Sequence, residues 1–418
     1  MYYFKNCLIA LISTFLLISC SEDLQQPTFQ FISSDTAEVG SRYPNLYVDN
    51  TGMVTMSWIL RIDEELFALQ YANYDDGQWT EPTTIHVGTD FFVNWADFPS
   101  AVSRDGELVA AHRLKKIDGG TYAYNVNVLF PEEESRRWTE PITPHNDETA
   151  TEHGFVSMEP LSDDKVLAIW LDGRHTEHRA HDEYGDPSQS MTLRSAEVSS
   201  DGTMSRSVEI DDMVCDCCQT DLIRTDDGAI AVYRGRTEDE IRDIRFSRYD
   251  LETGSWSEPT VIYNDNWQIG ACPVNGPRIE TNGEVVAVSW FTQADDKSSV
   301  KVSISEDGGV TFGEPTVISN ERVVGRTDVL VRDNGDVYVS WMESRNGVGD
   351  IMLQRIGEES SAMPLRIGIT SSSRRSGMPR MAKTDDAILF SWTQTEPNMR
   401  IRTALFPFDT DLEAIVNR

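Results

Sequence analysis

The chain has 418 residues, and its 36 Lys and Arg residues against 69 Asp and Glu residues give a formal net charge of −33. A phosphate backbone requires a basic protein surface, so this charge argues against nucleic acid as a partner. Apolar residues make up 39% of the chain and charged residues 25%, which is typical of a folded protein and excludes a wholly disordered one.

The first twenty residues predict an export signal. Lys5 precedes an apolar run at residues 7–18, which is too short to cross a membrane comfortably but has the length of a signal-peptide core. The run ends in Leu17-Ile18-Ser19-Cys20, which resembles the lipobox of bacterial lipoproteins and implies a lipid on Cys20. An ordinary secretory signal with an incidental cysteine is the alternative.

Three segments follow from this signal. We expect a signal peptide at 1–19, a lipidated tether at 20–27 and a single domain at 28–418. No other stretch has the roughly 18 apolar residues that a spanning helix needs, so the lipid would be the only membrane attachment. Ser21-Glu22-Asp23 resembles the acidic tag that sends some outer-membrane lipoproteins to the cell surface, with a periplasm-facing position as the alternative.

Two repeated motifs decide the architecture. An aromatic residue followed by x-Glu-Pro recurs at intervals of about 60 residues, one of them doubled, with copies that begin at Trp79, Trp138, Trp256 and Phe312. A β-rich run that follows a tight-turn dipeptide recurs seven times in one phase. These runs end at Trp58, His112, Trp170, Tyr233, Trp290, Trp341 and Trp392.

The repeats predict an all-β protein. Small antiparallel sheets of four strands that recur every 40 to 60 residues or so are the signature of a β-propeller. Seven copies predict seven blades, and the apolar segment 28–32 would supply the missing outer strand of the last blade. The alternatives are a six-bladed propeller of the sialidase type and a pair of β-sandwiches.

One turn carries a resemblance to a known family. The segment from Ser305 to Phe312 matches the Ser-x-Asp-x-Gly-x-Thr-aromatic pattern of the Asp-box, or BNR repeat. In this turn Asp307 would accept backbone N–H groups while glycine adopts a positive φ. The chain therefore resembles the sialidase-like propellers. Asp-boxes occur in enzymes and in non-enzymes, so the resemblance implies the fold more strongly than the chemistry.

Sialidases bind a carboxylate with three arginines and use a tyrosine, activated by a glutamate, with an aspartate as the acid/base. The Arg-Ile-Pro motif that normally carries the first arginine is absent here. By blade phase, the resemblance implies Asp97 as acid/base and Tyr233 with Glu159 as nucleophile and activator. The corresponding carboxylate ligands would be Arg174, Arg236 and Arg326.

Loops before the first strand and after the second strand of each blade form the functional face of a propeller. Arginines are frequent in these loops even though the chain is acidic; they include Arg42, Arg61, Arg113, Arg174, Arg234, Arg236, Arg326, Arg345 and Arg375. A basic mouth would suit a carboxylated or sulfated sugar. The alternative is that each arginine pairs with a nearby acidic residue.

Two segments raise the question of a metal. A polar loop contains His175, His178, His181, Asp182 and Glu183, and is read either as a metal site or as a solvated loop. Cys215, Cys217, Cys218 and Cys272 are the cysteines that follow Cys20. In an exported protein they predict two disulfides. The alternative is a thiolate site for copper or zinc, with His153 and Asp97 on the same rim.

The sequence thus favours a monomeric lipoprotein that binds an anionic carbohydrate, with exo-glycosidase activity as a further possibility. A non-catalytic propeller that binds glycan or protein is one alternative, and a cysteine-centred metal or redox site is another. No cofactor is expected apart from a soft metal ion or Ca²⁺, and the chain lacks EF-hand spacing.

Overall fold

The computed structural model describes residues 30–32, 37–132, 137–177, 187–357 and 363–409. The predicted signal peptide, the lipid attachment residue Cys20 and the tether lie outside these ranges. The same holds for His178, His181, Asp182 and Glu183 of the polar loop.

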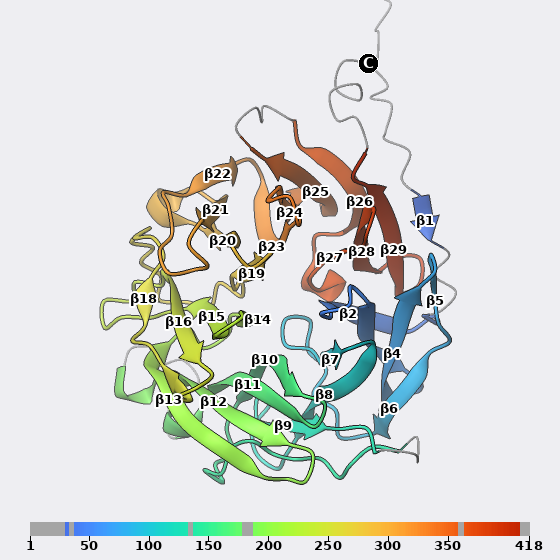
Figure 1. Cartoon of the computed structure of the whole chain (residues 1–418), viewed down its shortest axis with the longest axis vertical. Helices are drawn as coiled ribbons and strands as arrows, with labels where there is room; N and C mark the ends of the chain where they lie inside the picture. Colours follow the sequence, from blue (N-terminus) through green and yellow to red (C-terminus); the bar gives the residue numbers. More distant parts are fainter. Residues whose placement is uncertain (1–29, 33–36, 133–136, 178–186, 358–362, 410–418) are drawn as a thin grey trace, which may run out of the picture.

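Seven antiparallel sheets stand radially around a central axis, so the protein is a seven-bladed β-propeller (Figure 1). Blade 1 comprises β2 (Ser41–Val48), β3 (Val54–Arg61), β4 (Phe67–Asp75), β5 (Gln78–Trp79) and β6 (Thr83–Gly88). Blade 2 comprises β7 (Ala101–Arg104), β8 (Glu107–Lys116) and β9 (Tyr124–Leu129). Blade 3 comprises β10 (His153–Ser162), β11 (Lys165–Asp172), β12 (Met191–Ser199) and β13 (Met204–Val214).

Blade 4 comprises β14 (Asp221–Arg224), β15 (Gly228–Arg234), β16 (Ile244–Asp250), β17 (Ser255–Trp256) and β18 (Thr260–Val261). Blade 5 comprises β19 (Arg278–Thr281), β20 (Val286–Thr292), β21 (Ser299–Ser305) and β22 (Thr316–Ser319). Blade 6 comprises β23 (Val323–Val331), β24 (Val337–Arg345), β25 (Val348–Ile356) and β26 (Leu365–Ser371). Blade 7 comprises β27 (Arg380–Lys383), β28 (Ala387–Gln394), β29 (Arg400–Pro407) and β1 (Gln30–Ile32).

Short 3₁₀ turns are the only helices in the described part of the chain: η1 (Arg174–Thr176), η2 (Pro187–Gln189), η3 (Ala294–Asp296) and η4 (Arg374–Ser376). None of these is long and apolar enough to cross a membrane.

The second strand of every blade contains one of the seven aromatic or histidine positions that the repeat predicted. These strands are buried on both faces because each blade packs between two neighbours. In β3, for example, the first seven residues are all buried. The apolar runs therefore show little alternation, as expected for strands without a solvated face.

Aromatic residues of the x-Glu-Pro motif join neighbouring blades. The indole of Trp256 in blade 4 donates a hydrogen bond of 2.8 Å to Ser195 Oγ in blade 3. Trp79 in blade 1 likewise reaches Thr403 Oγ1 in blade 7 at 3.4 Å. Phe312 packs edge to face on Phe246 of the preceding blade, with ring centroids 5.1 Å apart. Before Phe312, the Asp307 carboxylate accepts the backbone N–H groups of Val310 and Thr311, at 3.1 and 2.9 Å.

The N-terminal strand closes the ring. In β1, Gln30 lies opposite Leu405 and Ile32 lies opposite Thr403 of β29, in an antiparallel pairing. Figure 1 shows this blue strand beside the red strands of blade 7. The prediction that the segment near residue 30 completes the seventh blade is therefore confirmed.

Candidate functional site

The first strands of the blades lie nearest the central axis (Figure 1), and three of these strands have an unusual backbone near their start. Tyr43, Phe155 and Arg326 have φ values of 55°, 53° and 52°. Each lies where the pairing of the first and second strands shifts register, as at a β-bulge. Positive φ at a non-glycine residue costs about 1 kcal/mol or more, and such strain and bulges concentrate at sites where a side chain is given a special direction.

Four arginines lie near these strand starts, in blade 1 and in the turn that leads into blade 7. They are Arg42 of β2, Arg61 of β3, and Arg374 and Arg375 of η4. Burial lowers the pKa of Arg42, and the charges of Arg61 and Arg375 lower it further. The three guanidinium groups are therefore close enough to repel one another. In the described part of the chain, none of the four is paired with a carboxylate. We call these four residues the arginine cluster.

Aromatic side chains border the arginine cluster. The guanidinium carbons of Arg326 and Arg374 lie 5.1 and 5.8 Å from the ring centroid of Trp95. Tyr43 is nearly buried, which raises the pKa of its hydroxyl, while Arg42 and Arg375 oppose that rise. The cluster thus combines positive charge with two aromatic side chains, Tyr43 of β2 and Trp95 of the segment between β6 and β7.

A cavity of about 80 Å³ lies among the first strands, lined by residues of blades 1 to 5 and 7. Arg278 in this cavity is held between Asp221 and Asp328, both at 3.1 Å. Arg380 also lines it, and burial together with the charge of Arg278 lowers the pKa of Arg380 to about 9. The cavity therefore contains paired charges, unlike the arginine cluster.

The predicted acid/base Asp97 lies in the loop before β7 and is buried. Its carboxylate accepts the Phe155 N–H at 2.8 Å and contacts the Tyr124 hydroxyl at 2.7 Å. Burial raises the pKa of Asp97 to about 7. Tyr124 also lies 2.8 Å from Glu152. A hydroxyl has one proton to donate, so a neutral Asp97 that donates to Tyr124 would satisfy all three groups.

The hydrogen bond from a backbone N–H to an aspartate of the preceding blade, as between Phe155 and Asp97, occurs at two more places around the axis. Asp221 accepts the N–H of Ile279 and Asp328 accepts that of Met381, both at 2.8 Å. Asp97 is therefore the first of three aspartates that tie one blade to the next. This repeated structural role would not be visible without the three-dimensional register.

The structure places Tyr233 and Glu159 apart. The Tyr233 hydroxyl donates to Asp211 at 2.9 Å, and the side chain is 0% exposed. Glu159 instead accepts the Tyr47 hydroxyl at 2.9 Å, and burial raises its pKa to about 8. Neither is within hydrogen-bonding distance of Asp97 or of the other.

The three predicted carboxylate ligands are each occupied by different partners. Arg174 makes hydrogen bonds of 2.7 and 2.9 Å to Asp172, and Arg236 contacts Glu240 at 2.5 Å. Arg326 donates to Ser376 Oγ at 2.6 Å and to backbone carbonyl groups of the η4 loop. Arg174 and Arg236 are therefore paired with acidic residues close in the sequence, as the alternative interpretation of the arginines expected.

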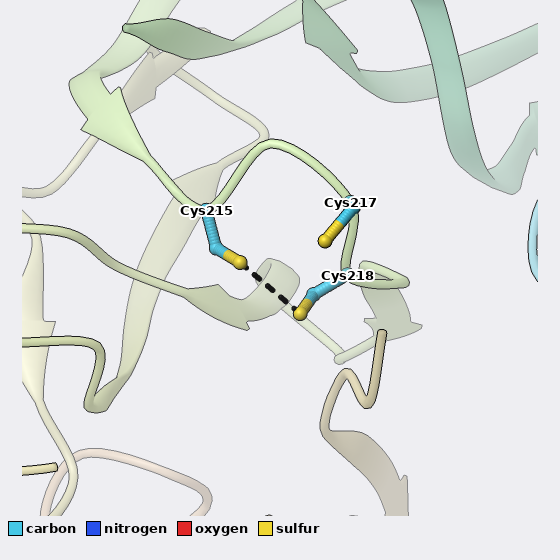
Figure 2. A group of neighbouring side chains, drawn as sticks. All are labelled: Cys215, Cys217 and Cys218. Carbon is cyan, nitrogen blue, oxygen red and sulfur yellow. Dashed lines mark hydrogen bonds between the residues drawn. The ribbon is translucent and has the colours of Figure 1, made fainter. Parts of the chain in front are cut away.

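The cysteine segment precedes β14, at the same end of the blades as the arginine cluster. Cys215, Cys217, Cys218 and Cys272 are free thiols, and the Sγ atoms of Cys215 and Cys218 are 3.2 Å apart (Figure 2). A disulfide bond is about 2.05 Å long, so the predicted disulfides are not present in the structure. The Gln219 side chain after the cysteines donates to the Ala96 carbonyl at 2.8 Å, which brings the segment next to Trp95.

His153 does not join the cysteines. Its Nε2 lies 3.1 Å from Asp147, and its ring stacks on that of His145 with centroids 3.8 Å apart. Arg174 lies 3.6 Å from the same Asp147 carboxylate. This cluster is a separate group of polar side chains in blade 3, and His145 and Asp147 were not singled out from the sequence.

Of the arginine cluster, the sequence predicted Arg42, Arg61 and Arg375 only as three of many arginines on the functional face. Trp95 was missed. The available signal was the absence of an acidic residue within two positions of Arg42 and Arg375, in contrast to Asp172 beside Arg174.

No protein family and no curated protein matches the sequence. Several solved propellers resemble the structure at low identity. A PL25 ulvan lyase is 11% identical, with 92% of this chain and 99% of that chain covered and a TM-score of 0.50. A protein of unknown function from Dyadobacter fermentans is 12% identical over 91% and 98% of the chains, with a TM-score of 0.47. The NanB sialidase from Streptococcus pneumoniae is 12% identical over 91% and 71%, with a TM-score of 0.44.

Proposed function

We propose that this protein binds an anionic saccharide, carboxylated or sulfated, at the arginine cluster. The observation that carries the proposal is that Arg42, Arg61, Arg374 and Arg375 lie on one part of the rim with no acidic partner in the described residues, although the chain has a net charge of −33. Cations held near one another repel, and an anion between them removes that cost. Planar guanidinium groups also suit carboxylate and sulfate oxygens.

The aromatic residues favour a sugar over a small inorganic anion. Trp95 lies beside Arg326 and Arg374, and its indole offers an apolar face next to the charges. Such a combination of apolar surface and a few polar groups is typical of small-molecule sites. The ulvan lyase and the sialidase act on glycans by their names, but at this identity they support the fold alone.

We propose binding without hydrolysis. A glycosidase of the sialidase type needs a tyrosine and a carboxyl that reach the sugar. Tyr233 is fully buried against Asp211, and Asp97 is buried between Phe155 and Tyr124. Hydrolysis of an activated glycoside that is lost in Tyr233→Phe would overturn this part of the proposal.

The binding test uses isothermal titration calorimetry with sialyllactose, uronate oligosaccharides and sulfated oligosaccharides. We expect at least one series to bind, and Arg42→Ala and Arg375→Ala each to weaken that binding tenfold or more. Arg355→Ala is the matched control, because Arg355 is a surface arginine paired with Asp336 at 2.8 Å. Affinity should fall as salt rises. Equal affinities for all four proteins, or no binding, would contradict the proposal.

We also propose that the protein is attached to a membrane by a lipid on Cys20. The support is the signal-peptide pattern of the sequence, since this residue lies outside the described structure. Labelling with a fatty-acid analogue in a bacterial host should give a labelled protein that loses the label in Cys20→Ala. Labelling that persists in the variant would exclude this attachment.

A further inference from the structure

Three cysteine side chains converge in the loop between β13 and β14. Cys215 and Cys218 are 1% and 2% exposed, and Cys217 is half-buried. The Sγ atoms of all three lie within 4.8 Å of one another. Figure 2 shows the Cys217 sulfur directed into the space between the other two. The backbone holds this shape, because the Cys215 N–H donates to the Arg234 carbonyl at 2.9 Å.

The sulfur spacing fits a shared metal ion. Thiolates bound to one ion at about 2.3 Å each are separated from one another by about 4 Å. The Sγ atoms of Cys215 and Cys218 are 3.2 Å apart, and all three Sγ atoms lie within 4.8 Å of one another. Small side-chain rotations would therefore place all three sulfur atoms around one centre.

The surrounding charge also indicates an anionic group at this place. Arg234 is buried, and its guanidinium donates only to the backbone carbonyl groups of Asn275, Arg242 and Phe291 in the described residues. The Asp243 carboxylate lies near enough to interact with this charge, but it accepts the Asn266 and Trp267 N–H groups and not a hydrogen bond from Arg234. A buried cation is stabilised by nearby anions, and thiolates of the cysteine group would add to the charge of Asp243.

A second arginine contacts the sulfur directly. Nη1 of Arg242 lies 3.3 Å from Cys215 Sγ. The same guanidinium is ion-paired with Glu240 at 2.7 Å. A guanidinium beside a sulfur stabilises the negatively charged thiolate. Thiolate is the form that binds metals. The contact with Arg242 therefore favours a negatively charged sulfur at Cys215.

We propose that Cys215, Cys217 and Cys218 bind a soft d¹⁰ metal ion through their thiolates. Cu(I) and Zn(II) are the ions that thiolate ligands select. Three sulfur ligands complete the coordination of Cu(I), whereas Zn(II) takes four ligands. Cys272 lies close to Cys217 and is the available fourth sulfur. The role of Cys272 therefore distinguishes the two ions.

The other cluster of metal-ligating side chains does not carry the same inference. His145, Asp147 and His153 have ligand atoms close together. The guanidinium of Arg174, however, already lies 3.6 Å from Asp147 and 2.7 Å from Asp172. The Asp147 carboxylate is also hydrogen-bonded to His145 and to His153, both at 3.1 Å. A metal ion would have to break these bonds, so the cysteine group is the better metal site.

The test uses the mature chain, purified and reduced without oxygen, and titrated separately with Zn(II) and with Cu(I) in the presence of a chelating competitor. We expect one equivalent of one ion to bind, and Cys215→Ser and Cys218→Ser each to weaken binding at least 100-fold. If the ion is Cu(I), Cys272→Ser should leave the affinity unchanged, and if it is Zn(II), Cys272→Ser should weaken binding at least tenfold. Thermal unfolding of each variant shows whether it is folded.

Alkylation of the wild-type thiols provides a readout that needs no variant. Metal should protect Cys215, Cys217 and Cys218 from iodoacetamide, as measured by peptide mass spectrometry. No binding of either ion to the reduced chain, unchanged binding in folded Cys→Ser variants, or alkylation that metal does not slow would each overturn the proposal. These experiments do not involve a saccharide, so their result is independent of the arginine cluster.

Discussion

Asp97 should make the stability of the protein depend on pH. Burial raises its pKa from 3.8 to about 7, so the folded protein keeps a proton that the unfolded chain releases near pH 4. The resulting stabilisation is fully present below about pH 4 and is lost as the pH rises through about 7. A pKa difference of this size corresponds to about 4 kcal/mol in total, and to about 2.5 kcal/mol between pH 5 and pH 8.

Replacement of Asp97 by asparagine should remove this dependence. The amide can still accept the Phe155 N–H through its oxygen and can donate to the Tyr124 hydroxyl oxygen, but it does not ionise. The assay is equilibrium urea unfolding of both proteins at pH 5 and pH 8. We expect the wild type to lose about 2.5 kcal/mol more than Asp97→Asn between these values.

Other buried carboxyls do not obscure the comparison. Glu159 and Glu280, whose pKa values burial raises to about 8 and about 7, titrate in both proteins and cancel in the difference. If the wild type and Asp97→Asn have the same pH dependence, the reasoning about the buried proton is refuted.

Three further predictions concern stability and are measured by thermal or urea unfolding. Gly154→Ala should destabilise the protein by about 3 kcal/mol, because the added methyl group would overlap a neighbouring carboxylate, whereas Gly120→Ala, with open space around it, should change it little. Arg326→Ala should cost about 3 kcal/mol through its lost buried hydrogen bonds, against less than about 0.5 kcal/mol for exposed Arg322→Ala. Removal of residues 30–32 should lower the melting temperature by several degrees, because it exposes the edge of blade 7. Unchanged unfolding in any of these would contradict the corresponding contact.

Sequence patterns predicted the architecture well because a propeller repeats the same local unit. The aromatic that ends the second strand, such as Trp290, and the turn around Asp307 each depend on residues close in the chain. Closure by the strand at Gln30 was predictable because the last repeat lacked an obvious fourth strand and the segment near Gln30 is apolar. Each of these features is determined within one repeat or by the count of repeats.

The site was harder to predict because side-chain partners come from different blades. Tyr233 bonds to Asp211 on the outer strand of the preceding blade, and no spacing in the sequence indicates that pair. The partner of Arg174 is two residues away and could have been anticipated, whereas the lack of a partner for Arg375 depends on every loop around it. The cysteines were located correctly by local spacing, but spacing alone did not distinguish thiols from disulfides.

Closure of the ring has a consequence for the order of events during synthesis. The strand at Gln30–Ile32 is synthesised long before its partner at Arg400–Pro407. Contacts between such distant segments form slowly because a long loop must close first. Until then the edge of blade 7 lacks its outer strand, and an unpaired strand edge of this kind is prone to aggregation.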